Sequence, residues 1–236
     1  MATIPLQPAK ASSWALLYKA GSVSAAVYVV LVLVPMVLVF TAPVPPDSGG
    51  PLLAYIAAHK VVYLVELVSF VGLAVPALVV FTAVATALMR VDKSLALLGG
   101  LLGVVSETIA LALGSSPQSL HGGLVVLSTS YAAAGTATER SGLASAADAL
   151  IAATNAVSWA GILTATAILL LSVLMREEPF GRPLVVLGVV TGALGIVSET
   201  LRPVLGPGYL AYGLLLPTWF ALVGWRLARL PTPASE

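Results

Sequence analysis

Charged side chains interrupt two apolar stretches of the sequence, and their types are those that hold ions, protons or polar ligands. Glu107 lies in the middle of LLGVVSETIALALG, and Glu199 and Arg202 lie in ALGIVSETLRPVLG. A third apolar stretch, KVVYLVELVSF, carries Glu66. An ionisable group in such surroundings is expensive to bury and is normally paired, neutralised or placed beside water. These four residues are therefore the first candidates for a binding site.

The spacing of these residues predicts how their charges are satisfied. Glu199 and Arg202 are three positions apart, a separation at which side chains meet on one helix face, so we expect an ion pair. Glu107 has no such neighbour, because the position that corresponds to Arg202 is Ala110. It must share Arg202, bind a cation or stay protonated through desolvation. A structural Glu–Arg lock, a proton or cation role, and binding of a polar-headed ligand all remain open.

The segments that carry these residues are predicted to be membrane helices. The chain of 236 residues is 59% hydrophobic and 9% charged, whereas ordinary soluble domains are about 25% charged. A run of about 20 apolar residues is long enough to cross a bilayer. We therefore predict an all-α polytopic bundle, a single transmembrane domain over 1–236 in contact with the lipid bilayer. Its six expected spans are 22–41, 61–89, 95–114, 156–175, 184–205 and 210–227.

The distribution of positive charge predicts the orientation. With six spans, one side of the membrane holds eight Lys and Arg residues and the other holds three, namely Lys60, Arg140 and Arg202. An excess of positive charge marks the cytoplasmic side, so both termini are expected to be cytoplasmic. At about 1.5 Å of rise per residue, all four candidate charges then fall in the outer half of the bilayer.

Two features are expected at the outer surface. The segment 119–135 contains glycines and hydroxyl side chains, and we interpret it as an outer half-helix or re-entrant segment packed on protein. The second and fourth spans are expected to project outward by two or three turns, in helical extensions that begin at Pro51 and Leu143. Gly50-Pro51 places proline near a helix start, and Ser145-Ala-Ala-Asp148 resembles a capping box.

An internal repeat relates two of the charged positions. Shifting the sequence by 92 residues aligns 95–114 with 187–206 at ten identical positions of twenty, including both Ser-Glu-Thr triplets. This predicts two related helix pairs of the same topology, a parallel repeat with units at approximately 51–114 and 143–206. Glycines at helical spacing precede each triplet, which favours close helix packing on the face that carries the glutamate.

The shared depth of the charged groups predicts one polar cluster. We expect Glu107, Glu199 and Arg202 to form an intramembrane pocket, with Glu66 near its mouth and Trp159 as a candidate wall residue. These five residues form the predicted ligand-binding set; no catalytic or metal-ligating residues are assigned. Two histidines at the outer end, His59 and His121, have the residue type that axial haem ligation requires. Interfacial placement is the competing interpretation of both histidines.

Several classes of function are excluded or disfavoured by composition. The chain has no cysteine, which excludes disulfides, thiolate metal sites and thiol nucleophiles. A net charge of +1 provides no basic patch for nucleic acid. No phosphate loop, HExxH or GxSxG motif is present, so an enzyme is disfavoured and no cofactor is indicated.

Four stretches of the sequence are similar, in chain order, to a prokaryotic family of multi-pass membrane proteins. They are KVVYLVELVSF, ALMRVDKSLALLGGLLGVVSE, RPLVVLGVVTGALGIVSE and PGYLAYGLLLPTWFALVGWRL. The similarity covers roughly residues 15–228. The family is an uncharacterised one of unknown function, so the resemblance implies a helical bundle in a prokaryotic cell membrane and no activity.

The leading functional hypothesis is a non-enzymatic membrane protein whose polar pocket binds a small ligand, a lipid headgroup or a cation. The alternative is an accessory or scaffold subunit of a larger membrane complex, or a homo-oligomer. A haem-binding or lipid-modifying membrane protein is a minor alternative.

Overall fold

The computed structural model describes residues 14–43, 45–114, 120–176 and 180–230, and the described chain is helical throughout. Six helical segments are long and apolar enough to cross a membrane, which confirms the predicted bundle of six spans. The helices are α1 (Ala15–Thr41), α2 (Gly49–Ala58), α3 (Lys60–Gly72), α4 (Ala74–Leu88), α5 (Lys93–Leu113), α6 (Gly122–Ala133), α7 (Ala137–Asn155), α8 (Trp159–Leu174), α9 (Arg182–Thr200), α10 (Arg202–Leu205) and α11 (Tyr209–Leu227).

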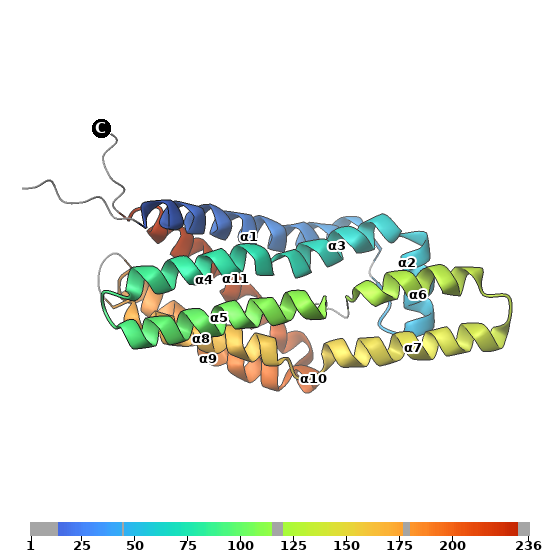
Figure 1. The fold of residues 1–236 in the computed structure, drawn as a ribbon. Helices are drawn as coiled ribbons and strands as arrows, with labels where there is room; N and C mark the ends of the chain where they lie inside the picture. The colour runs from blue at the N-terminus through green and yellow to red at the C-terminus, as the bar shows by residue number, and fades with distance from the viewer. Residues whose placement is uncertain (1–13, 44, 115–119, 177–179, 231–236) are drawn as a thin grey trace, which may run out of the picture.

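The six spans form one bundle in which neighbours along the chain mostly pack side by side (Figure 1). Helix α8 packs against both α5 and α9, whereas α1 packs against α3, α4 and α11. The buried core is apolar, with Trp219, Phe81 and Phe220 among its largest side chains. The rings of Trp219 and Phe220 meet edge to face at a centroid distance of 5.2 Å. Such aromatic pairs contribute to packing beyond the area that they bury.

The second span is two helices rather than one. Helix α3 ends at Gly72 and α4 begins at Ala74, although together they are long enough to count as one span of 29 residues. Pro76 lies in the first turn of α4 and has no N–H to donate to the carbonyl of Gly72, so regular helix pairing is lost there. A proline inside an apolar span such as 61–89 is expected to kink the helix, and the structure has a break in the helix at this point.

The predicted fifth span, 184–205, is also interrupted, and the prediction of one continuous helix was wrong. Helix α9 ends at Thr200, and the short helix α10 starts at Arg202. Pro203 follows, and a proline ring inside a helix clashes with the carbonyl four residues earlier, here that of Glu199. The break leaves Arg202 on a separate short helix, but still close to Glu199.

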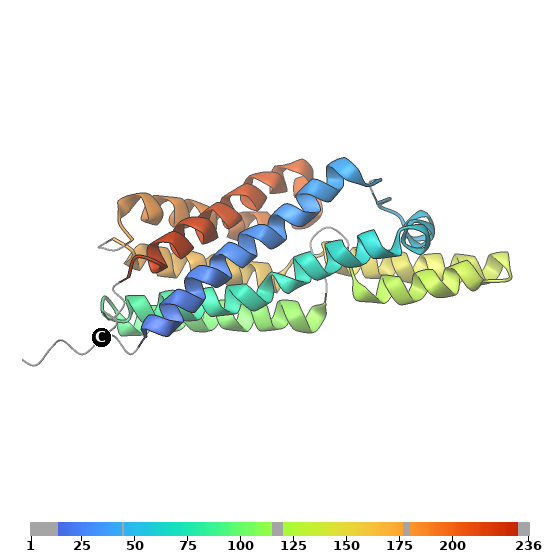
Figure 2. The same cartoon turned by 90° about the horizontal axis from the view of Figure 1, so that it is seen from above.

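Beyond one end of the bundle, α6 and α7 lie side by side as a helical hairpin (Figures 1 and 2). Helix α6 confirms a short helix within the predicted segment 119–135 that is not one of the six long spans; residues 115–119 lie outside the described part. Helix α7 has 19 residues, which corresponds to about 28 Å of length. The hairpin therefore extends the molecule by far more than the two or three turns expected from the sequence.

The start of this hairpin helix was predicted wrongly. Helix α7 begins at Ala137 rather than at Leu143. Its N-cap is Thr136, whose hydroxyl accepts a hydrogen bond from the N–H of Glu139 at 3.2 Å. The Glu139 carboxylate in turn accepts from the N–H of Gly135 at 3.1 Å. This pair of bonds is close to a capping box, and the Thr-x-x-Glu pattern was the available start signal.

Pro51 predicts a helical extension of the second span, but helix α2 does not continue that span in a straight line. It crosses the base of the hairpin and packs against α6 and α7 (Figure 2). Asp148 of α7 accepts a hydrogen bond from the N–H of Gly49 at 2.7 Å and so caps the start of α2. A side chain at Gly49 would meet that carboxylate at 2.9 Å, so glycine is required at this contact.

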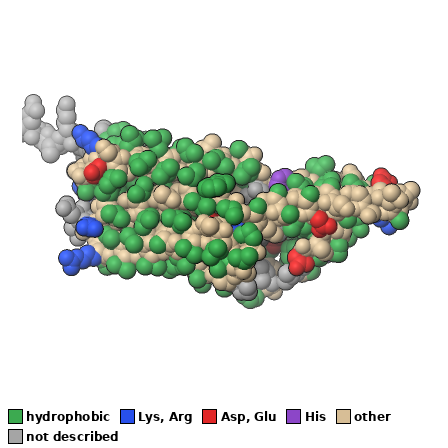
Figure 3. All heavy atoms as spheres, turned by 90° about the horizontal axis from the view of Figure 1, so that it is seen from below, with side chains coloured by type: hydrophobic (Ala, Val, Ile, Leu, Met, Phe, Trp, Pro, Cys, Tyr) green, Lys and Arg blue, Asp and Glu red, His purple; other side chains and the backbone are tan. Residues whose placement is uncertain are grey.

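Basic side chains gather at the end of the bundle that is opposite the hairpin (Figure 3). Here α1, α5 and α9 begin and α4, α8 and α11 end. Acidic side chains are visible on the hairpin in the same view, and α7 carries Glu139 and Asp148. The described basic residues at the bundle end are Lys19, Arg90, Lys93, Arg176, Arg182, Arg226 and Arg229.

Candidate functional site

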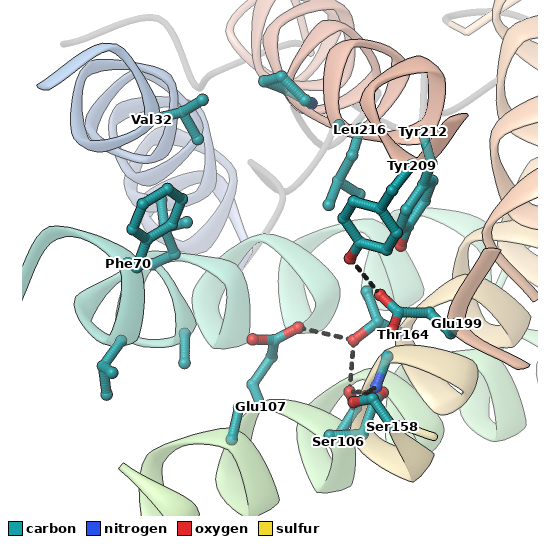
Figure 4. A pocket seen from close by; sticks show the side chains of 18 of the residues that line it. Val32, Phe70, Ser106, Glu107, Ser158, Thr164, Glu199, Tyr209, Tyr212 and Leu216 are labelled. Atoms are coloured by element: carbon teal, nitrogen blue, oxygen red, sulfur yellow. Dashed lines mark hydrogen bonds between the residues drawn. The ribbon is translucent and has the colours of Figure 1, made fainter. Parts of the chain in front are cut away.

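A cavity of about 290 Å³ lies inside the hairpin-proximal half of the bundle (Figure 4). It is bordered by α1, α3, the start of α4, α5, α8, α9, α10 and α11. Its volume is near the lower end of the range of small-molecule sites. The polar residues of the lining are Tyr28, Ser106, Glu107, Ser158, Thr164, Glu199, Arg202, Tyr209 and Tyr212.

One part of the polar lining is the predicted ion pair. The guanidinium of Arg202 contacts Glu199 Oε2 directly, so this part of the sequence-based prediction is confirmed. Glu199 Oε1 accepts a second hydrogen bond from the hydroxyl of Tyr209 at 2.6 Å. Arg202 also donates to the carbonyl of Thr154 at 3.3 Å and lies over the ring of Tyr209 at 5.5 Å. The Glu199 carboxylate is therefore held by donors from α10 and α11 at once.

A glycine on α8 makes room for this pair. A Cβ atom at Gly161 would lie 2.5 Å and 2.6 Å from the two carboxylate oxygens of Glu199. The amide of Gly161 donates to the hydroxyl of Ser158, the N-cap of α8, at 3.0 Å. The beginning of α8 is thereby fixed directly against the carboxylate.

Glu107 is held by a different set of partners. Its Oε1 atom accepts a hydrogen bond from the hydroxyl of Thr164 at 3.0 Å. The hydroxyl of Thr164 also contacts that of Ser106, which donates to the carbonyl of Ala160 at 2.6 Å. This chain fastens α5 to α8 and fixes the position of the carboxylate.

The second oxygen of Glu107 is free to meet a ligand. Within the part of the chain that the structure describes, Oε2 has no hydrogen-bond partner, and Glu107 lines the cavity (Figure 4). The residue itself is only 8% exposed. Arg202 stays with Glu199 rather than being shared with Glu107 by a direct contact. A largely buried carboxylate with one open oxygen is the chemically distinctive group of this cavity.

The opposite walls are apolar and aromatic. Phe70 comes from α3 and Tyr212 from α11 (Figure 4). Tyr28 of α1 also lines the cavity. Tyr209 and Tyr212 pack edge to face at 5.8 Å. These rings form the aromatic part of the cavity wall. The faces of aromatic rings carry negative partial charge, which attracts cations.

The remaining predicted site residues lie elsewhere. Glu66 is buried on α3, one turn before Phe70, but among the described residues it is not part of the cavity lining. Trp159 is 72% exposed and does not line the cavity, which corrects its assignment as a wall residue. The aromatic side chain of Trp159 and its position inside a span predict a residue of the pocket wall. However, Trp159 is the first residue of α8 and points outward, while its neighbours Ser158 and Ala160 line the cavity.

The two histidines are placed at the base of the hairpin, outside the cavity lining. His59 stacks on Tyr55 at a centroid distance of 4.7 Å. His121 is the N-cap of α6, and its Nδ1 accepts from the N–H of Gly123 at 2.9 Å. Over the described ranges, no group of three or more His, Cys, Asp or Glu side chains is placed to hold a metal ion.

The six long apolar helices define a multi-pass integral membrane protein, and the cavity lies within their bundle. Comparisons with protein-family models, with curated proteins and with solved structures give no match for this chain. The function must therefore be inferred from the geometry of the site itself.

Proposed function

We propose that this protein is a non-enzymatic membrane protein that binds a polar-headed ligand in the cavity beside Glu107. The observation that carries this proposal is the open oxygen of Glu107, which faces a space of about 290 Å³. A small organic ligand, a lipid headgroup or a hydrated cation has the required polarity.

The alternative, a structural Glu–Arg lock, explains only one half of the site. Glu199 is already satisfied by Arg202 and Tyr209, and this pair needs neither Glu107 nor a cavity. The lock therefore leaves the cavity and the open oxygen of Glu107 without an explanation.

A cavity-filling substitution tests the proposal. Ala110 lines the cavity, whereas Ala112 on the same helix is exposed. We expect Ala110→Phe to abolish retention of a co-purifying small molecule, because the ring occupies its space, and Ala112→Phe to retain it. Native mass spectrometry of protein purified in mild detergent measures both. Equal retention by both variants, or no bound molecule in the unaltered protein, would contradict a ligand site here.

The orientation of the bundle is inferred from its charge. The basic end shown in Figure 3 matches the cytoplasmic excess of Lys and Arg that governs insertion, which supports cytoplasmic termini and an outward-facing hairpin. Thr138 at the hairpin tip and Ser94 at the basic end are both exposed.

Single cysteines test this topology in the cysteine-free chain. We expect an impermeant thiol reagent to label Thr138→Cys on intact cells, because the hairpin faces outward. Ser94→Cys should react only after the membrane is permeabilised. The opposite pattern would reverse the proposed orientation, and labelling of both sites from outside would reject six spans.

We also infer that the two Ser-Glu-Thr triplets belong to a parallel repeat. Helices α5 and α9 both pack on α8, and each brings its glutamate to the same cavity. This common placement supports duplication of a helix pair, and a prokaryotic origin remains what the family resemblance predicts.

A role as an accessory subunit is the second candidate function. The α6–α7 hairpin favours it, because a long helical projection beyond the bundle offers a surface to another protein (Figure 2). A partner that co-purifies in stoichiometric amount would support this role. A lone protein that carries a bound small molecule supports the ligand site.

A further inference from the structure

We propose that the ligand is an amphiphile with an ammonium headgroup, which enters from the lipid between α1 and α11. This inference rests on the proposed ligand site and specifies its chemistry. It follows from three features: the charge of the cavity, the nature of its walls and the position of its apolar edge.

The charge of the lining favours a cation. Its charged residues among the described positions are Glu107, Glu199 and Arg202. Arg202 is committed to Glu199, so that pair is neutral as a unit. Glu107 has the hydroxyl of Thr164 as a donor but no cation in contact within the described chain. A buried carboxylate without a counter-charge is unfavourable, and an ammonium group would supply the missing charge together with donors for Oε2.

The walls favour the same headgroup. Tyr28, Phe70, Tyr209 and Tyr212 all line the cavity, and aromatic faces attract ammonium groups more strongly where water is excluded. An anionic headgroup would meet the carboxylate of Glu107. Arg202, the cation among the described lining residues, is already paired with Glu199, although its Nε–H has no partner within the described chain. A neutral headgroup could supply donors to Oε2 but no counter-charge for the carboxylate.

The edge of the cavity favours an attached hydrocarbon chain. Met36 of α1 is 43% exposed, and Leu210 and Leu214 of α11 are 65% and 51% exposed. These three residues line the cavity and also face outward on membrane-spanning helices. The opening therefore leads to lipid rather than to water.

The size of the cavity limits how much of the ligand it can hold. A volume of about 290 Å³ is at the lower end of the range of small-molecule sites. A headgroup and the first few methylenes fit, whereas the rest of an acyl chain must lie outside. We therefore place the ammonium group beside Glu107 and the chain along the surface of α1 and α11.

Binding of three C12 probes tests the headgroup. Dodecylamine, dodecanol and dodecanoate are added at equal mole fractions to the protein in maltoside micelles, and thermal unfolding is followed. We expect dodecylamine to raise the unfolding temperature and the other two to have little effect. Equal stabilisation by dodecanol or dodecanoate would overturn the ammonium assignment while leaving a ligand site in place.

Variants and a short amine complete the test. Glu107→Gln should weaken dodecylamine binding by about 10- to 100-fold, because a charge-assisted hydrogen bond is lost. Ala110→Phe should abolish the stabilisation, and Ala112→Phe should retain it, which keeps the test decisive if the glutamine variant does not fold.

Propylamine that binds as tightly as dodecylamine would overturn entry from lipid. Failure of all probes, together with no co-purifying molecule, would reject the ligand site itself.

Discussion

Arg202→Ala is expected to lower the free energy of unfolding by about 3–5 kcal/mol, because it leaves a buried carboxylate without its counter-charge. Glu199 would retain the hydroxyl of Tyr209 as a donor, at 2.6 Å, but would lose the guanidinium. The carbonyl of Thr154 would lose its Arg202 donor as well. Reversible unfolding in mixed micelles measures the loss.

The double variant Glu199→Gln with Arg202→Met provides the control. It removes both charges, so most of the lost stability should return, since a buried ion pair often contributes little more than well-packed neutral residues. If the double variant folds and still retains the co-purifying ligand, the Glu199–Arg202 pair is a structural lock and Glu107 is the residue that recognises the ligand. An Arg202→Ala protein as stable as the unaltered one would show that Glu199 does not depend on this partner.

Gly192→Val is expected to destabilise the bundle by about 3 kcal/mol, at the upper end of the usual cost of overpacking. A Cβ atom at Gly192 would lie 2.7 Å from the carbonyl oxygen of Ala165 and 2.8 Å from the amide nitrogen of Leu169. Both are backbone atoms of α8 and cannot rotate away. Helices α8 and α9 would have to separate, which would also displace Glu199. Thermal unfolding in detergent measures this effect.

Gly142→Ala is the matched control. Gly142 lies in α7, and no atom is within 4 Å of the position of an added Cβ. Alanine is about 1 kcal/mol better than glycine inside a helix, so this variant should be neutral or more stable. Equal loss of stability in both variants would mean that close approach of α8 and α9 is not what Gly192 provides.

The spans and the ion pair could be predicted because their causes are local. Bilayer thickness sets the length of a span, and helix geometry places Glu199 beside Arg202 even though the helix breaks between them. Pro76 predicts a kink within 61–89, but an apolar run does not indicate whether the helix bends or ends there. The start of α7 was missed for another reason: Ser145 offered a competing capping pattern, and Thr136 forms the cap.

The partners of Glu107 could not be predicted, because they depend on tertiary packing. Thr164 is 57 positions away along the chain and is one of many hydroxyl residues in the spans. Which face of α8 meets α5 decides that Thr164 and Gly161 reach the cavity and that Trp159 does not. A single sequence indicates the apolar content of α8 and the position of its N-cap, but not this rotation.

The contributions of α1 and α11 to one cavity have a consequence for biogenesis. Helix α1 is the first of the six spans and α11 is the last. They contribute Tyr28, Met36, Tyr209 and Tyr212 to the cavity lining. During synthesis, Glu107 and Glu199 must enter the membrane before α11 is available to cover them. The cavity is thus complete only when α11 has docked against α1, and until then Glu199 lacks the hydroxyl of Tyr209 as a donor.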